Sequence, residues 1–338
     1  MRLPFIFAEK PFLLYRFLKI YVRFVIRFYC YSIRVNKPEL LKINGPLLIA
    51  SNHPNSFLDA MIYDILFDTP IWSLARGDVF KRFPKAIPFL SAVKIFPIYR
   101  TREGVQNLSE NYETFDACMQ VFKKGEAVTI FSEALCVNEW RLRPLKKGTA
   151  RIAFMAWEKN LPVQVLPAGI NYSSFRRYGK QIDVNFGNLM QSSDFNLSDT
   201  DGNKHLAFTK QLQQQLTGLV YEIEKGDHQT FSQKFGIRRN TLKKVLLFIP
   251  SLLAVVLNWP IYLAAKMFTK WLIKNSDHYD AVVFAFLLFF YPVYILLATA
   301  AAWLITQNAW SLLLLLIMPL TVLAYVRSHV RKDKSFHI

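Results

Sequence analysis

The feature that most constrains this chain is a run of 46 consecutive residues, 281–326, without a single Asp, Glu, Lys or Arg. A membrane-spanning helix needs about 20 predominantly apolar residues, so the run has room for two helices and a short turn. The polar pair Gln307 and Asn308 lies near its middle. We therefore expect a transmembrane hairpin made of residues 281–305 and 309–326.

A second uncharged run, 245–265, precedes the hairpin and contains Pro250 and Pro260. Basic residues flank it on both sides, so a single crossing would place one basic cluster on the wrong side by the positive-inside rule. We expect a re-entrant or in-plane element here, with a single span as the alternative. The whole hydrophobic region is then 241–338, and both ends of the hairpin face the cytoplasm.

The N-terminal region, residues 1–36, contains basic residues spaced three or four positions apart among aromatic ones. The basic residues are Arg16, Lys19, Arg23 and Arg27. On a helix this spacing makes a cationic face beside an aromatic-rich face, which suits the interface of an anionic membrane leaflet. We expect an interfacial amphipathic helix; the alternative is an amphipathic helix docked on its own domain.

Charge and hydrophobicity indicate different partners. The chain has 42 Lys and Arg against 24 Asp and Glu, a formal net charge of +18, and 52% of its residues are hydrophobic. A strongly basic chain is often a nucleic-acid binder, but no RNP, zinc-finger or recognition-helix pattern is present. Because much of the positive charge flanks the apolar runs, we expect membrane lipids and an anionic substrate as partners, and no nucleic acid.

The three cysteines, Cys30, Cys118 and Cys136, are widely separated and form no C-x-x-C pair. This spacing predicts neither a zinc site nor a disulfide framework, and it fits a reducing compartment. We expect no metal and no cofactor.

Between residues 37 and 190, short apolar runs alternate with longer helical patterns. The expected strands are 46–50, 95–98, 127–131, 163–166 and 181–186. Such alternation predicts an α/β fold with a mixed, largely parallel sheet flanked by helices. Residues 191–240 would be a helical extension. Functional groups in such sheets gather at the carboxyl ends of the strands.

The first expected strand is followed by His53, with Asp59 six positions further on. A histidine whose second ring nitrogen is held by a carboxylate can act as a general base. No Gly-x-Ser-x-Gly motif or reactive cysteine is near, so the pair would activate the substrate's own hydroxyl. Alternatively, Ser56 and Asp59 form a helix-capping pair. The residues by themselves favour neither interpretation.

Two other strand ends carry charged residues. Arg100 and Arg102 follow the run 95–98, and paired guanidinium groups can bind a phosphate. Glu133 follows the run 127–131, where its carboxylate could bind substrate hydroxyls. These positions predict a site for a phosphate-bearing substrate at one edge of the sheet.

The order and spacing of these segments resemble the glycerolipid acyltransferase superfamily. Four blocks over about 120 residues carry the resemblance: Asn52-His53 with Asp59, Ile98-Tyr99-Arg100, Phe131-Ser132-Glu133-Ala134, and the segment from Pro162 to Pro167. Five residues separate His53 from Asp59, where four are commoner in the superfamily. Lys94, Ser132 and Ala134 also replace residues that are usual there.

The resemblance implies a mechanism and a role for each matching residue. His53 would deprotonate the acceptor hydroxyl and Asp59 would orient His53. Arg100, with Arg102, would hold the acceptor phosphate, and Glu133 would order the pocket and bind an acceptor hydroxyl. Asn52 and Ser132 complete the expected substrate-binding set.

The implied activity is transfer of a fatty acyl group from a thioester of coenzyme A or acyl carrier protein to glycerol-3-phosphate or 1-acylglycerol-3-phosphate. The enzyme would be an integral membrane protein with its catalytic domain on the cytoplasmic face. The alternatives are another lysolipid acceptor, an amino-acid lipid acceptor, or a non-catalytic lipid-binding scaffold of the same fold.

Overall fold

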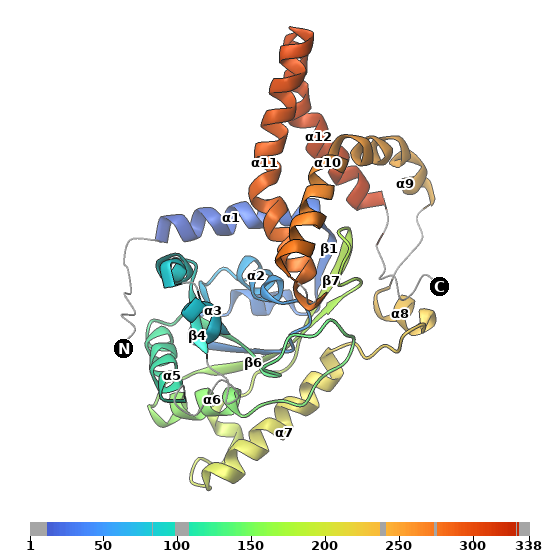
Figure 1. The fold of residues 1–338 in the computed structure, drawn as a ribbon. Helices are drawn as coiled ribbons and strands as arrows, with labels where there is room; N and C mark the ends of the chain where they lie inside the picture. Colours follow the sequence, from blue (N-terminus) through green and yellow to red (C-terminus); the bar gives the residue numbers. More distant parts are fainter. Residues whose placement is uncertain are drawn as a thin grey trace.

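The computed structural model describes residues 12–82, 84–98, 108–236, 241–273, 276–328 and 330. Its centre is a seven-stranded sheet in the order β1-β7-β6-β2-β5-β3-β4 (Figure 1). The strands are β1 (Cys30–Val35), β2 (Leu47–Ser51), β3 (Ile71–Arg76), β4 (Ile95–Ile98), β5 (Ala127–Phe131), β6 (Gln164–Tyr172) and β7 (Lys180–Phe186). Every neighbouring pair is parallel except β6 and β7. The expected mixed, largely parallel α/β sheet is confirmed.

Twelve α-helices lie within the described residues. Eight belong to or follow the sheet: α1 (Phe12–Tyr29), α2 (Phe57–Leu66), α3 (Gly77–Arg82), α4 (Ile87–Ala92), α5 (Leu108–Lys123), α6 (Gly148–Glu158), α7 (Asp201–Leu219) and α8 (His228–Lys234). The other four form the hydrophobic C-terminal part: α9 (Thr241–Leu246), α10 (Phe248–Leu272), α11 (Tyr279–Thr306) and α12 (Leu314–Ser328).

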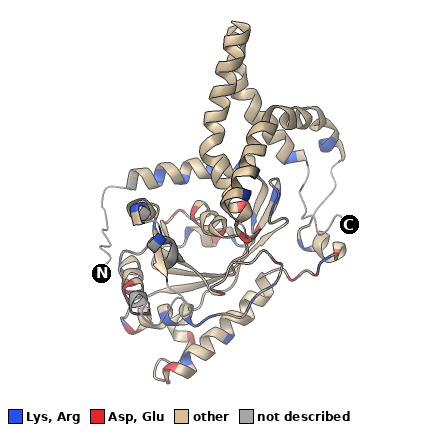
Figure 2. Cartoon of the chain, in the orientation of Figure 1, with Lys and Arg blue, Asp and Glu red and all other residues tan. Residues whose placement is uncertain are grey.

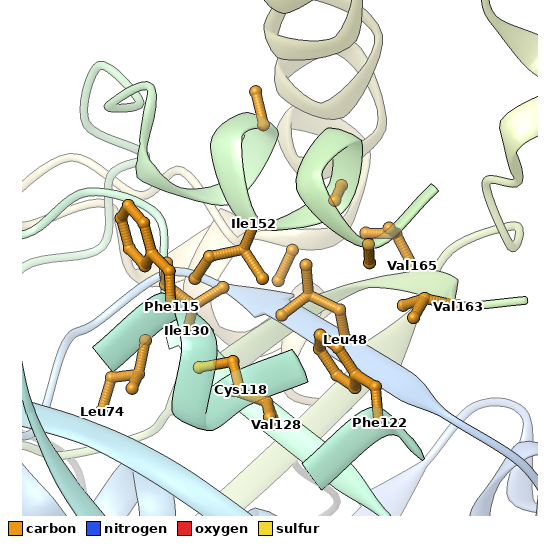
Figure 3. Close-up of a cluster of buried hydrophobic side chains, with 14 of the residues drawn as sticks. Leu48, Leu74, Phe115, Cys118, Phe122, Val128, Ile130, Ile152, Val163 and Val165 are labelled. Carbon is orange, nitrogen blue, oxygen red and sulfur yellow. The ribbon is translucent and has the colours of Figure 1, made fainter. Parts of the chain in front are cut away.

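The two faces of the sheet bury two separate cores, because successive side chains of a strand point to opposite faces. Leu48 of β2 packs on one face with Phe122 of α5 and Ile152 of α6 (Figure 3). Ile49 of the same strand packs on the other face with Ile62 of α2. Side chains from α1 and the start of α11 join this second core. The membrane-like helix α11 is therefore built into the α/β domain.

Two strands differ from the sequence expectation. Cys30–Val35 forms the edge strand β1, although the N-terminal region is expected to be a helix. The aromatic pattern of the helix continues through Tyr31, so the sequence does not mark where the helix ends. Ile71–Arg76 forms β3 between β5 and β4 and is also not among the expected strands. Both pair in the sheet through tertiary contacts that local pattern does not reveal.

Helix α1 has two opposite apolar faces. One face packs on the domain through the buried residues Tyr15, Val22, Ile26 and Tyr29. The other is exposed and comprises Leu13, Phe17, Ile20 and Phe24, which are 80%, 65%, 66% and 57% exposed. Figure 1 shows α1 running across the foot of the α11–α12 hairpin. The helix therefore docks on its own domain and still presents an apolar stripe that suits a membrane interface.

Within the described part of the chain, three helical segments are long and apolar enough to cross a membrane: Phe248–Leu272, Tyr279–Thr306 and Ala309–Ser328. The α11–α12 hairpin projects from the domain, and its projecting part carries no charged side chain (Figure 2). The helices turn at Gln307, which has a φ of 49°, as expected for the Gln307-Asn308 pair. These helices indicate membrane association.

The run 245–265 lies largely within α10, which begins at Phe248 and continues to Leu272. The helix therefore extends beyond the uncharged run at its C-terminal end. Pro260 lies inside this helix, and buried Asn258 accepts a hydrogen bond from the Tyr291 hydroxyl of α11 at 2.9 Å. Polar bonds of this kind hold apolar helices together. The re-entrant or in-plane placement of this helix in the membrane stays a prediction, with a single span as the alternative.

Gly169 of β6 lies directly against the end of α7. A Cβ at this position would come within 2.5 Å of the Leu219 backbone oxygen. The same oxygen accepts hydrogen bonds from the side-chain amides of Asn171, at 3.0 Å, and Asn185, at 2.9 Å. Only glycine lets the strand approach this closely.

We expect Gly169→Ala to destabilise the protein by about 1–3 kcal/mol, because the methyl group forces α7 away from the sheet. The matched control is Gly218→Ala, where a Cβ would meet nothing within 4 Å among the described residues. Thermal unfolding in detergent should show a lower midpoint for the first variant and an equal or higher midpoint for the second. An unchanged midpoint for Gly169→Ala would contradict this packing.

Candidate active site

The turn between β2 and α2 carries the predicted histidine. β2 ends at Ser51 and α2 begins at Phe57, so His53 lies at the carboxyl end of a central strand. The residue before the helix, Ser56, has a φ of 55°. This positive φ, which residues other than glycine rarely adopt, turns the chain so that the first turn of α2 folds back toward His53.

Asp59 is fully buried and accepts hydrogen bonds from three groups. Its Oδ2 lies 2.8 Å from His53 Nδ1 and accepts the backbone N–H of Asn55 at 2.8 Å. Its Oδ1 accepts the Tyr172 hydroxyl of β6 at 2.7 Å. Three donors from the turn and a neighbouring strand hold the carboxylate in one orientation, which favours the His53 tautomer with a proton on Nδ1.

The imidazole of His53 is fixed on a second side by an aromatic ring. Phe131, at the end of β5, stacks on it with ring centroids 3.9 Å apart and an interplanar angle of 12°. The His53 side chain is 17% exposed. Because Nδ1 is engaged by Asp59, Nε2 is the ring nitrogen left to accept a proton from a ligand.

Glu133 holds the backbone of the same turn. Its Oε2 accepts the N–H of His53 at 3.0 Å, and its Oε1 accepts the N–H of Arg143 at 2.8 Å. Burial raises the pKa of this carboxyl above its ordinary value, and the two backbone donors oppose that rise. The structure thus places Glu133 beside His53 in an ordering position, while binding of a substrate hydroxyl stays a prediction.

The other two described residues of the expected binding set are buried and have partners inside the protein. The Asn52 side-chain amide exchanges two hydrogen bonds with the backbone of Ile170, at 3.1 and 2.8 Å. The Ser132 hydroxyl lies 2.9 Å from the Thr149 hydroxyl. Both connect the carboxyl end of a strand to neighbouring elements. Their contact with a substrate stays a prediction.

Arg100 and Arg102 lie outside the described residues. β4 ends at Ile98, two residues before Arg100, and its neighbour in the sheet is β3. Their role in phosphate binding stays a prediction.

The capping alternative for Ser56 and Asp59 does not match the geometry. Ser56 precedes α2 but makes no side-chain capping bond, and its hydroxyl lies 2.9 Å from Nδ1 of His278. Its backbone N–H is directed to Cys136 Sγ at 3.0 Å rather than to Asp59. The carboxylate of Asp59 therefore serves His53 and the turn, and it is not part of a reciprocal capping box.

The nearest cysteine is not suited to covalent chemistry. Burial raises the pKa of the Cys136 thiol, and the carboxylate of Asp59 raises it further. A thiol of this kind stays protonated near neutral pH and is a poor nucleophile. Cys136 is free, as are the buried Cys30 and Cys118. The arrangement supports general-base activation of a ligand hydroxyl by His53.

A second buried carboxylate lies beside the turn and is not among the residues predicted from the sequence. Asp280, at the start of α11, forms a fully buried ion pair with Lys180 of β7. Its Oδ2 also accepts the side-chain amide of Asn55 at 2.7 Å, and its Oδ1 accepts the Tyr29 hydroxyl at 2.5 Å. Asp280 immediately precedes the long uncharged run, a position typical of a charged residue that flanks a membrane helix. Its sequence context therefore does not reveal this role.

The short segment before α11 contacts the turn again. Asn138 donates its side-chain amide to the backbone oxygens of Pro54, at 2.7 Å, and Asp277, at 3.1 Å. Together with the bond between His278 and Ser56, these contacts attach the segment before the hairpin to residues 53–56. The hydrophobic hairpin is therefore joined to the candidate site by several independent hydrogen bonds.

Comparisons with known proteins give a family match and similar solved structures. The family model described as Acyltransferase matches residues 32–171. Among solved structures, the chain is similar to the 1-acyl-sn-glycerophosphate (LPA) acyltransferase PlsC from Thermotoga maritima, with 10% sequence identity and a TM-score of 0.40. That similarity covers 61% of this chain and 78% of the other. Comparison with curated proteins gives no match.

The range matched by the family model begins in β1 and ends in β6. It contains both members of the His53–Asp59 pair and Glu133. Residues 32–171 therefore form an acyltransferase domain, and this domain carries the motifs that resemble the glycerolipid acyltransferase superfamily.

Proposed function

We propose that this protein transfers a fatty acyl group from an acyl thioester to a hydroxyl of glycerol-3-phosphate or 1-acylglycerol-3-phosphate at a membrane. The observation that carries the proposal is the pairing of His53 Nδ1 with the buried carboxylate of Asp59 at 2.8 Å. This pair leaves Nε2 of a partly exposed imidazole as the base, inside a domain of the acyltransferase family. The nearest cysteine among the described residues, Cys136, has a buried thiol whose raised pKa makes it a poor nucleophile.

In the proposed reaction the acceptor hydroxyl gives its proton to Nε2 of His53 as its oxygen attacks the thioester carbonyl carbon. The imidazolium that forms is stabilised by the Asp59 carboxylate, which keeps its negative charge. When the tetrahedral adduct collapses, the carbon–sulfur bond breaks and the thiolate takes the proton from His53. The products are an ester and a free thiol, either coenzyme A or acyl carrier protein, and the enzyme returns to its starting state.

The acceptor is inferred from charge. Arg100 and Arg102 follow β4, and the backbone of Arg143 is held by Glu133 next to His53. Guanidinium groups bind phosphate through paired hydrogen bonds, so a phosphate-bearing acceptor fits this edge of the sheet. Another lysolipid or an amino-acid lipid is the alternative acceptor.

Asp280 and Asn55 act in this proposal as positioning residues. Asn55 lies between His53 and Asp59, and its side chain is bonded to the first turn of α11. The helix therefore holds the turn where His53 meets the acceptor. Placing the domain on the cytoplasmic face follows from the basic residues that flank the hydrophobic helices.

The experiment that tests the activity measures acyl transfer by the purified full-length protein in detergent. It crosses glycerol-3-phosphate and 1-acylglycerol-3-phosphate with acyl-coenzyme A and acyl-acyl carrier protein. We expect transfer to at least one phosphate-bearing acceptor. His53→Ala should lower kcat by at least about a hundredfold, which is the lower range for general-base catalysis.

The control is His205→Ala, which removes an imidazole from α7 on the other face of the sheet. It should retain turnover. Transfer only to other lysolipids would replace the acceptor assignment, whereas full activity of His53→Ala would remove His53 from the mechanism.

Asp59→Asn tests the orienting carboxylate. Asparagine can still form hydrogen bonds at this position, but it supplies no charge to stabilise the imidazolium. We expect kcat to fall by at least about a hundredfold while the acceptor KM changes little.

Asp64→Asn provides the comparison, because Asp64 lies on the same helix and its bonds go to Tyr15 and Lys19. It should alter stability more than turnover. If Asp59→Asn showed normal kcat with reduced thermal stability, the carboxylate would be structural only.

A further inference from the structure

A cavity of about 490 Å³ lies away from the candidate active site. Its walls come from the second half of α1, from β1 and the turn after it, from the end of α2, and from the end of α12. Ile26, Ile33, Leu41 and Leu66 form much of its apolar lining. It is therefore a compartment between the α/β domain and the last hydrophobic helix.

Four cationic side chains and one carboxylate line the cavity: Arg23, Arg27, Lys42, Arg327 and Asp68. Two of these cations have internal partners. Arg23 donates Nε to the Ile65 oxygen at 2.8 Å and lies 3.8 Å from Asp68, and Arg327 donates to the Tyr31 oxygen. These bonds fix the two guanidinium groups but leave an excess of positive charge.

Arg27 and Lys42 are exposed and have no hydrogen bond or ion pair within the described part of the chain. They come from different elements, α1 and the turn before β2. Cations gathered from separate elements around one cavity create a local positive potential that favours an anion. A phosphate group suits such a set, because several donors can share its oxygens.

The surroundings of the cavity suit a lipid. The exposed apolar stripe of α1, made of Leu13, Phe17, Ile20 and Phe24, lies on the helix that supplies two of the cations. Arg327 ends α12, whose apolar body is long enough to cross a membrane together with the preceding turn. Figure 1 shows that α1 and the end of α12 lie where the hairpin leaves the domain. This is the level at which headgroups would meet the protein.

The cavity is separate from the acyl-transfer site. The pair His53–Asp59 lies at the start of α2, whereas the cavity is lined by the end of that helix. None of the candidate active-site residues that the structure describes lines it. An occupant here would therefore be an additional ligand and not the acceptor undergoing reaction.

We propose that this cavity binds the phosphate headgroup of an anionic membrane lipid. The headgroup phosphate contacts Arg27, Lys42 and Arg327, and the acyl chains lie along the apolar lining and the exposed stripe of α1. The bound lipid contacts α1, β1 and α12 at the membrane surface. It therefore holds the domain at a fixed distance from the bilayer.

The test measures lipid retention by native mass spectrometry of the full-length protein in detergent. Phosphatidylglycerol and phosphatidylcholine with the same acyl chains are the two probes. We expect phosphatidylglycerol to be retained in preference. Arg27→Gln combined with Lys42→Gln should weaken its binding by about tenfold or more, since each cation near an anionic lipid contributes about 1 kcal/mol.

The matched control combines Lys244→Gln with Lys270→Gln, two exposed lysines of α9 and α10 that do not line the cavity. It removes the same charge and should leave binding unchanged. Equal retention of both lipids, equal losses in the two double variants, or wild-type binding by the cavity variant would each overturn the proposal.

A competition arm separates a lipid headgroup from a free phosphate ester. Glycerol-3-phosphate added at the concentration of phosphatidylglycerol should not displace the lipid, because it cannot occupy the apolar lining. Displacement at equal concentration would overturn the lipid assignment. The readout is binding, so its failure is distinct from a failure of acyl transfer.

Discussion

The buried ion pair between Lys180 and Asp280 is the interaction on which the arrangement of this protein depends. Neither side chain is exposed, and taking two charges out of water costs several kcal/mol per ion unless partners compensate. Here Tyr29 and Asn55 add hydrogen bonds to the same carboxylate. The site therefore exists only when β7, α1, α11 and the turn after β2 are all in place. Membrane hairpin and α/β domain form one structural unit.

The candidate active site also contains buried carboxylates whose hydrogen-bond donors come from different elements. Asp59 is buried among three donors, and Glu133 among two backbone N–H groups, so each carboxylate is fixed by groups from different elements. A base held in this manner needs little rearrangement when a substrate arrives. The hydrogen-bonded turn thus fixes His53, the proposed base, relative to the sheet.

The sequence predicts those parts of the fold and the site that depend on local residue patterns. Uncharged length identifies the hairpin, alternating runs identify the α/β sheet, and the spacing of His53 and Asp59 identifies the pair that the structure brings together. It does not predict β1, or the partners Tyr172 and Asp280, because these depend on contacts between segments more than 100 residues apart. From sequence alone, a charged residue at the edge of an apolar run resembles one that flanks a membrane helix. Only the tertiary structure shows that Asp280 is buried.

Asn55→Ala tests whether α11 holds the turn that carries the proposed base, and the measurement is its kcat for acyl transfer. This exchange removes the bond between the turn and Asp280 but leaves the Lys180–Asp280 ion pair and the Tyr29 hydrogen bond in place. We expect kcat to fall about tenfold to a hundredfold, with acceptor KM and membrane insertion near wild type, since small misplacements of a base cost about that much. A wild-type kcat in the folded, inserted variant would contradict it.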